Sequence, residues 1–319
     1  MTGDVPLGHG AEFDAIRQML ARWGLRATGI GDDAAVLRLP RGDALVASVD
    51  SAVEGRHFRR DWLTPREIGY RAVAAALSDL AAMAAAPSGV LIAMSVPDSW
   101  RASIQDLADG VGDAVDLAKT TIRGGNLTGG TELSITTTVF GTAFAPLSRG
   151  GARAHDRAYV TGTLGAPGAA LRRLLAGDGA GEYRAAFARP VPRLAEARWL
   201  ANAGASAAID ISDSLLADAG HLAAASGVRI EIDAACVPLV RGVELERALR
   251  SGEEYELLVT SRAGFDTAAF HQRFGIPLTE IGRIVERPPG TVGVGGVGDL
   301  VGLRGAHIAG DSGYDHFSS

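Results

Sequence analysis

The stretch TPREIGYRAVAAALSDLAAMAAAP, residues 64–87, predicts a long and almost wholly apolar helix. Thr64 is a good N-cap, Pro65 suits the first helical position, and Glu67 completes a capping box, so the start of the helix is well marked. Pro87 is expected to end the helix, because the residue before a proline is pushed away from helical geometry.

Strand-like runs lie on both sides of this helix and recur along the chain. ALVASVDS (44–51) precedes it and GVLIAMSVP (89–97) follows it, and the β-branched run ELSITTTVFGTA (132–143) suits a half-buried sheet. Together they indicate an alternating α/β pattern. The other expected elements are helices near 100–118, 190–204 and 215–227, strands at 120–125, 157–165, 206–214, 228–233 and 255–260, and a glycine-rich hairpin at 291–305.

A break in the pattern occurs at PLSRGGARAHD (146–156), which is rich in glycine and arginine. The length of 319 residues suits one large domain or two medium ones, and because of this break we place a domain boundary near residue 147. The expected domains are therefore 1–147 and 148–319.

Composition excludes several classes of protein. The net charge of −6 argues against non-specific nucleic-acid binding, which needs a basic face. One lysine stands against 30 arginines, so arginine would have to recognise any phosphate group. The single cysteine, Cys236, excludes an internal disulfide and fits a reducing, cytoplasmic location. We see no secretory signal at the N-terminus and no apolar run of 18 residues, so no membrane association is expected.

Common nucleotide-binding and hydrolase motifs do not identify the function of this chain. Gly293, Gly295 and Gly298 satisfy G-x-G-x-x-G, but the strand-like DLVGLRG follows where a dinucleotide fold needs a helix. The sequence contains no P-loop, no G-x-S-x-G elbow, no H-E-x-x-H and no cysteine cluster.

What remains is a set of aspartates at strand ends and on the apolar helix. Carboxylates in such places suit hard cations, and Mg²⁺ typically bridges them to substrate phosphates. The set comprises Asp32 and Asp33 after a glycine turn, Asp50 at the end of a strand, Asp79 on the helix, and Asp210 and Asp213 on either side of Ser212.

Each of these acids also has an ordinary structural explanation. A single aspartate at a strand end is usually a turn or capping residue, and Asp213 could cap the helix that follows it. Asp79 is harder to explain in this way, because an acid on an apolar helix is costly without a partner.

Eight motifs in a fixed order resemble the thiamine-monophosphate kinase family of the aminoimidazole-ribonucleotide-synthetase superfamily. They are GIGDDAAVL (29–37), SVDSAVEGRHF (48–58), ALSDLAAMAAAP (76–87), IRGGNLTGG (122–130), SRGGARAHDRAYVTGTLG (148–165), AIDISDSLLAD (208–218), SGEEYEL (251–257) and SGYDHF (312–317). The resemblance implies two domains, each a mixed sheet packed with helices, in an α/β protein that dimerises through its N-terminal strands. It also implies an N-terminal domain for metal and acceptor and a C-terminal domain for ATP.

The activity implied by the resemblance is transfer of the γ-phosphoryl group of ATP to thiamine monophosphate, with several Mg²⁺ ions. Clustered cations would screen the repulsion between two polyanions, and no nucleophile is needed because the acceptor is already an anion. The implied metal ligands are Asp33, Ser48, Asp50, Asp79, Asp210 and Asp213, with Asp50, Asp79 and Asp213 as the catalytic residues. Gly125, Asn126, Arg149 and Ser212 would bind ATP, and His57, Glu253 and Tyr314 would line the acceptor site.

The chain departs from the family pattern at four positions. Asn126 replaces an aspartate, Val49 a threonine, Ser214 a glycine and Ala76 an asparagine. These changes leave two alternatives open: a paralogue that uses ATP on a different small acid or phosphate, and a nucleotide-binding protein that has lost turnover.

Overall fold

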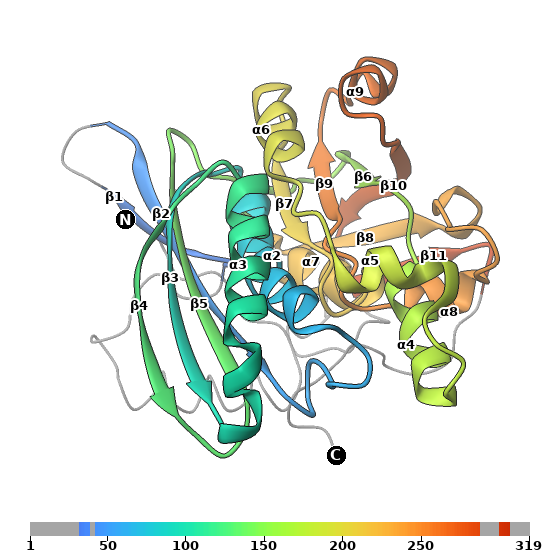
Figure 1. Ribbon diagram of the computed structural model, residues 1–319. Helices are drawn as coiled ribbons and strands as arrows, with labels where there is room; N and C mark the ends of the chain where they lie inside the picture. Colours follow the sequence, from blue (N-terminus) through green and yellow to red (C-terminus); the bar gives the residue numbers. More distant parts are fainter. Residues whose placement is uncertain (1–31, 39–41, 288–299, 307–319) are drawn as a thin grey trace, which may run out of the picture.

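The computed structural model describes residues 32–38, 42–287 and 300–306, which form two sheets with helices against them (Figure 1). The first sheet has the order β1-β2-β5-β3-β4, and only its β3–β4 pair is parallel. Its strands are β1 (Ala35–Arg38), β2 (Ala44–Val53), β3 (Ala86–Val96), β4 (Ile122–Gly129) and β5 (Ser134–Ala143).

Two helices cover one face of this sheet, α2 (Pro65–Ala82) and α3 (Ile104–Leu117), the latter preceded by the 3-10 turn η2 (Asp98–Ser103). The capping box at the start of α2 is confirmed, since Thr64 and Glu67 bond to each other's backbone N–H groups. The expected end of the helix at Pro87 is wrong. Ala84 adopts a left-handed conformation (φ 53°), and the N–H of Ala85 donates to the Leu80 carbonyl, so the helix ends before this point. Pro87 is already the second residue of β3.

The second sheet has the order β11-β8-β10-β6-β9-β7 and is also mixed, because β11 runs parallel to β8. Its strands are β6 (Arg157–Thr161), β7 (Ala207–Asp210), β8 (Val228–Asp233), β9 (Leu257–Ser261), β10 (Leu278–Glu286) and β11 (Val301–Arg304). Most of the expected hairpin at 291–305 lies outside the described residues.

Helices and short 3-10 turns connect these strands, and several of them were not expected from the sequence. The helices are α4 (Ala166–Ala176), α5 (Arg184–Ala188), α6 (Leu194–Asn202), α7 (Leu215–Ser226), α8 (Leu245–Leu249) and α9 (Thr267–Phe274), and the turns are η3 (Arg149–Gly151), η4 (Gly181–Tyr183) and η5 (Ala234–Cys236). Of these, α4, α5, α8 and α9, together with the strands β1 and β10, are additions to the predicted pattern.

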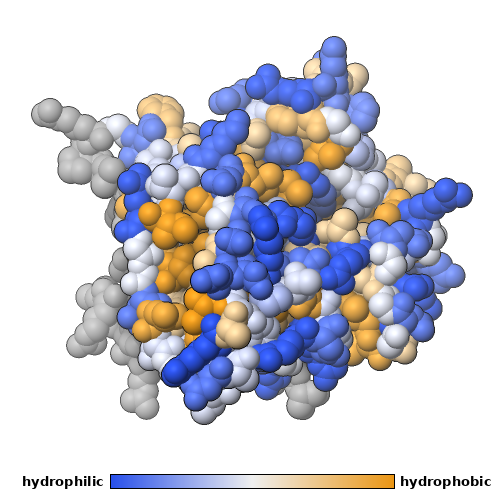
Figure 2. All heavy atoms as spheres, in the orientation of Figure 1, coloured by the Kyte–Doolittle hydropathy of each residue, from blue (hydrophilic) through white to orange (hydrophobic). Residues whose placement is uncertain are grey.

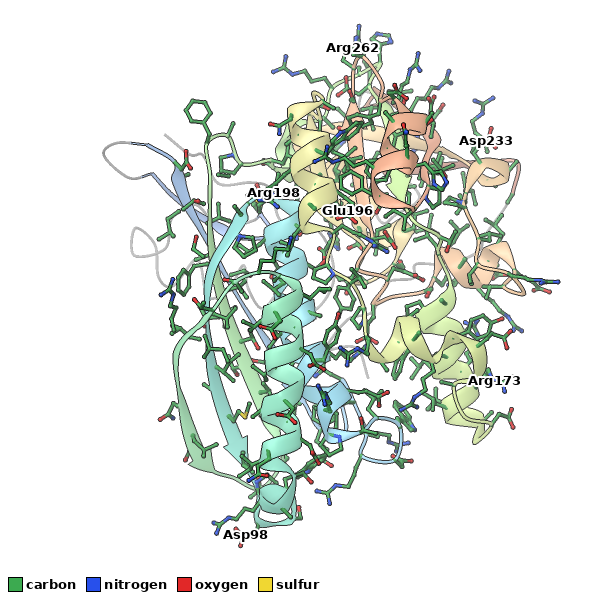
Figure 3. The ribbon with its side chains drawn as sticks, turned by 45° about the horizontal axis from the view of Figure 1, so that its top comes forward. Asp98, Arg173, Glu196, Arg198, Asp233 and Arg262 are labelled. Atoms are coloured by element: carbon green, nitrogen blue, oxygen red, sulfur yellow. The ribbon has the colours of Figure 1, made fainter. Side chains whose placement is uncertain are left out.

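Helix α2 lies between the two sheets and joins them into one core. Its Val73 and Leu77 belong to the same buried cluster as Phe187 of α5 and Leu200 of α6. A second cluster, which includes Ile209 and Leu222, fills the other side of the second sheet. Figure 3, which labels Glu196 and Arg198 of α6, shows side chains filling the space between the two halves. The expected fold class is confirmed. Because α2 contacts both sheets, its side chains can contribute to a site that lies between the two halves.

On the face that Figure 2 shows, apolar residues lie among charged ones. Val49, Leu91, Ile122 and Leu127 are exposed on the first sheet. Among the residues that the structure describes, helices of the length and apolar character needed to cross a membrane do not occur.

Candidate functional site

Three aspartates from three separate segments of the chain meet between the sheets. Asp33 lies just before β1, Asp79 lies near the end of α2, and Asp210 is the last residue of β7. Each offers a carboxylate oxygen within 4.8 Å of the others. We call Asp33, Asp79 and Asp210 the acidic cluster. It joins residues 177 positions apart in the sequence, so it exists only in the folded chain.

Two serine hydroxyls support the acidic cluster. The Ser48 hydroxyl of β2 donates to Asp79 Oδ2 at 2.5 Å, and the Ser78 hydroxyl of α2 donates to Asp210 Oδ2 at 2.6 Å. Adjacent helical residues point about 100° apart. Ser78 therefore faces the second sheet while Asp79 faces the first, which is how one turn of α2 serves both halves.

Arg149 pairs with one member of the acidic cluster. Its guanidinium donates to both carboxylate oxygens of Asp33, at 2.7 and 2.5 Å, and its backbone N–H donates to Asp32 Oδ1 at 3.1 Å. Burial lowers the pKa of Arg149, but Asp33, Asp210 and Asp32 together outweigh burial and the net shift is upward. Asp32 also accepts the N–H of Asp33, a geometry that suits a residue orienting the turn.

The acidic cluster carries more negative charge than these partners offset. Burial, together with Asp210 and Asp33, raises the pKa of Asp79 well above its usual value. Burial and the neighbouring Asp33 raise the pKa of Asp210 to about 7. Carboxylates whose charged forms are disfavoured in this way gain most from a bound cation. The donor set consists of oxygen atoms alone, which suits Mg²⁺ rather than a soft metal.

Asp50 lies beside the acidic cluster but is not part of it. Its Oδ1 accepts the N–H of Ser51 at 2.7 Å, and its charge contributes to the raised pKa of Asp79. The side chain is exposed, so it is open to a ligand.

Asp213 belongs to a different group, formed with Asp218 and His221 of α7, whose ligand atoms also lie within 4.8 Å of one another. We call Asp213, Asp218 and His221 the α7 cluster. The sequence left open that Asp213 caps α7, but in the structure the N-cap of α7 is a different residue. Ser214 caps the helix, because its hydroxyl accepts the N–H of Ala217 at 3.2 Å.

Asp218 shapes the loop that carries Ser212 and Asp213. Its Oδ2 accepts the N–H groups of Ser212, Asp213 and Ser214, each at 3.1 Å. Ser214 has a φ of 172°, an extended conformation that does not need glycine. The departure from the family glycine is therefore tolerated by the backbone. Sequence reasoning missed Asp218, although an acid in the first turn of a helix after a polar loop is a signal for such a role.

Two of the three expected acceptor residues, His57 and Glu253, lie on loops. His57 Nδ1 accepts the N–H of Val53 at 3.1 Å, so a neutral ring carries its proton on Nε2. Glu253 forms an ion pair with Arg71, and its N–H donates to the Ser212 carbonyl at 2.6 Å. Tyr314 lies outside the described residues.

Gly125 and Asn126 are not brought to the acidic cluster within one chain. They lie on β4, an edge strand whose residues are all exposed. Cross-strand pairing places Asp50, Thr137, Ile92 and Gly125 in one row, so Gly125 lies three strand spacings, about 14 Å, from Asp50. Gly125 also has a local reason to be glycine, since a Cβ there would stand 1.9 Å from the Ile92 carbonyl oxygen.

Comparison with known families matches both halves of the chain. Residues 31–143 match the AIR synthase related protein N-terminal domain, and residues 153–295 match the AIR synthase related protein C-terminal domain.

Named relatives match over most of their length. The thiamine-monophosphate kinase of Escherichia coli K12 is 37% identical, covering 91% of this chain and 92% of the relative. That of Bacillus subtilis is 30% identical, covering 86% and 92%. The solved structure of AaThiL complexed with AMPPCP and TMP is similar, with a TM-score of 0.82 and 30% identity over 96% of this chain and 97% of that one. The hydrogenase maturation protein HypE of E. coli, at 23% identity and a TM-score of 0.66, shares the fold.

Proposed function

The chain belongs to the thiamine-monophosphate kinase family of AIR synthase related proteins, and from this premise we propose that it phosphorylates thiamine monophosphate to thiamine diphosphate with ATP. The observation that carries the proposal is the acidic cluster, because it joins both family domains at one buried, oxygen-only site. Asp33 and Asp79 come from the N-terminal match and Asp210 from the C-terminal one.

Mg²⁺ is a finer part of the proposal. When bound by Asp33, Asp79 and Asp210, with Ser48 and Asp50 beside them, it would neutralise charge on the polyphosphate and on the transferred group. Asp213 would bind a further ion near Ser212. We assign the catalytic role to Asp50, Asp79 and Asp213, because in-line phosphoryl transfer depends on positioning and charge stabilisation.

Other side chains of this protein would bind and orient the two substrates. Arg149, held by Asp33, presents a guanidinium beside the acidic cluster for ATP, and the Ser212 turn is held in place by Asp218. His57, through its Nε2–H, and Glu253 would hold thiamine monophosphate. The acceptor phosphate attacks without a general base, since its oxygen is already ionised.

A homodimer is the second finer part of the proposal. Gly125 and Asn126 would contact ATP only if β4 of a second copy approached the acidic cluster, because their own β4 is too distant. The exposed Val49 and Leu91 of the first sheet offer apolar area for such a contact. The domain limits 1–147 and 148–319 and a cytoplasmic location stay predictions.

Incubation of the purified protein with ATP, Mg²⁺ and thiamine monophosphate tests the proposal. We expect ADP and thiamine diphosphate in equal amounts, identified by product mass. ADP formed only with another acceptor from a panel of small acids and phosphates would favour the paralogue, in which Asn126 marks a rebuilt site. ATP binding without turnover on any acceptor would favour the other alternative, a nucleotide-binding protein that has lost turnover.

A further inference from the structure

Arg71 of α2 is a buried cation that the sequence analysis did not single out. Only 5% of the residue is exposed. Its guanidinium forms an ion pair with Glu253 Oε1 through Nη2, donates from Nη1 to the Phe187 carbonyl, and lies 4.5 Å from the centre of the Phe187 ring. It therefore joins three segments: α2, α5 and the loop before β9.

The same face of α2 carries Ser78, which donates to Asp210 of the acidic cluster. Arg71 and Ser78 are seven residues apart, which is two helical turns, so both side chains point toward the second sheet. The Cα atoms of Arg71 and Asp79 are about 12 Å apart along a rigid helix. Helix α2 thus sets the distance between the acidic cluster, which contains Asp79, and Glu253, which pairs with Arg71.

The turn that carries Glu253 has an unusual backbone. Glu253 (φ 60°) and Tyr255 (φ 51°) both adopt the left-handed region, which non-glycine residues occupy only when their surroundings require it. The N–H of Tyr255 donates to the Ile211 carbonyl at 2.9 Å, and a Cβ on Gly252 would stand 2.8 Å from the Ser212 carbonyl oxygen. The 252–255 turn is therefore packed on the loop that carries Ser212 and Asp213.

The two partners of the ion pair differ in exposure. The Arg71 side chain is 6% exposed, whereas that of Glu253 is 31% exposed, so the carboxylate remains accessible to a ligand while Arg71 holds it from within. Burial alone would lower the pKa of Arg71, but Glu253, Tyr255 and Asp50 together raise it, so the guanidinium stays charged. Removing Arg71 would leave the Glu253 carboxylate without its cation, and removing Glu253 would leave the buried guanidinium without its anion.

We propose that Arg71 is a positioning residue for the acceptor: it fixes Glu253 and the 252–255 turn at a set distance from the acidic cluster. The inference rests on the proposed function, because it takes Glu253 as an acceptor-binding residue. It adds a residue that touches neither substrate and acts through Glu253.

Steady-state kinetics of Arg71→Met test the inference, with Arg184→Met as the matched control. Arg184 also bridges the 183–190 segment to α2, donating to Glu67 Oε2 at 2.6 Å and to the Trp62 carbonyl at 3.1 Å, but it does not contact the turn. We expect Arg71→Met to raise the KM for thiamine monophosphate by about tenfold or more, which corresponds to about 1.4 kcal/mol. The Kd for AMPPCP should change by less than about twofold, because ATP binding does not involve Glu253. Arg184→Met should change neither constant.

Coupling to Glu253 separates positioning from general packing. The double variant Arg71→Met with Glu253→Gln should have the same acceptor KM as Glu253→Gln alone, because Arg71 acts only through that carboxylate. Arg71→Lys keeps the charge and serves as the second variant if Arg71→Met does not fold. It should restore part of the acceptor KM.

Amide hydrogen exchange of the ligand-free protein gives a readout that does not depend on the reaction. Residues 252–256 should exchange faster in Arg71→Met and at the wild-type rate in Arg184→Met. If wild type phosphorylates another acceptor, the proposed function fails, and this exchange difference still decides the role of Arg71. An unchanged acceptor KM, equal losses for ATP and acceptor, or unchanged exchange at 252–256 would overturn the inference.

Discussion

The ligand atoms of the acidic cluster and of the α7 cluster lie within the same 4.8 Å of one another, but the two clusters differ in their hydrogen-bond donors. In the acidic cluster, Asp79 and Asp210 each accept from one serine hydroxyl, and Asp33 accepts from Arg149, the one cation that hydrogen-bonds to the cluster within the described residues. In the α7 cluster, three backbone N–H groups converge on one oxygen of Asp218.

This difference separates a site with little positive charge from a single carboxylate, Asp218, that backbone N–H groups hold in place, although burial, Asp213 and Asp210 raise the pKa of Asp218 as well. Buried carboxylates with few donors gain most from a bound ion, whereas a carboxylate that accepts three N–H groups already has a structural task. The distances between ligand atoms alone do not distinguish the two clusters. We therefore expect substitutions in the acidic cluster to affect catalysis and substitutions of Asp218 to affect stability.

The largest expected effect is that of Asp79→Asn on turnover. Loss of a charge-stabilising carboxylate should lower kcat by about 10²-fold or more. The matched control is Asp156→Asn, since Asp156 is also an aspartate with little exposure and accepts from the Arg153 N–H and the Ser206 hydroxyl away from both clusters. A normal rate per folded molecule in Asp79→Asn, with a lowered Tm, would make Asp79 a structural acid.

Asp218→Ala should act on stability instead. It removes the acceptor of three N–H groups, which should cost about 1–3 kcal/mol of unfolding free energy. Asp218→Asn keeps one carbonyl oxygen and should cost less. Urea unfolding measures both. A full loss of activity in Asp218→Asn at unchanged stability would place Asp218 among the metal ligands and remove the distinction between the clusters.

Stability of the metal-free protein should fall as pH rises from about 4 to about 7, in part through Asp210. Its carboxyl has a pKa of about 7 in the folded chain against 3.8 as the ordinary value, so the folded state binds more protons in this window. Below pH 4 both states are protonated and the effect vanishes. In the presence of a chelator, Asp210→Asn should show a smaller fall than wild type and a Tm about 3 °C higher at pH 8. Identical pH profiles would mean that Asp210 is not held in an unfavourable charged state.

The smallest expected effect is that of Asn126→Asp on the Mg²⁺ requirement. An added carboxylate strengthens binding of a hard cation, so half-maximal activity should occur at lower Mg²⁺ while kcat stays unchanged. A Mg²⁺ titration at saturating ATP compares the two forms. Equal midpoints would show that Asn126 lies outside the metal site, even in a dimer.

Local signals in the sequence predicted much of the fold. The capping box of Thr64 and Glu67 and the β-branched run of β5 are short-range features, so the elements that depend on them were expected. The end of α2 was missed because Ala84 closes it in a left-handed conformation that carries no sequence signal without glycine. The aspartates of the acidic cluster were all named in advance, because acids at strand ends and on an apolar helix stand out.

Other parts of the candidate site depend on contacts between distant segments. Arg71 looks like one more arginine until Glu253, 182 residues later, and Phe187 are placed against it. The distance of Asn126 from Asp50 likewise follows from strand order, which the sequence alone does not state. The contacts of Arg71 and the distance of Asn126 from Asp50 both depend on how distant segments are arranged in the fold, and short sequence motifs do not encode that arrangement.

Calorimetric titration of Mg²⁺ into the AMPPCP-bound protein tests the central claim, that the acidic cluster is the cation site of the kinase. Wild type and Asp156→Asn should bind Mg²⁺ alike, and Asp210→Asn should bind at least one ion about tenfold more weakly, a difference of about 1.4 kcal/mol. Equal affinities and stoichiometries in wild type and Asp210→Asn would contradict the claim.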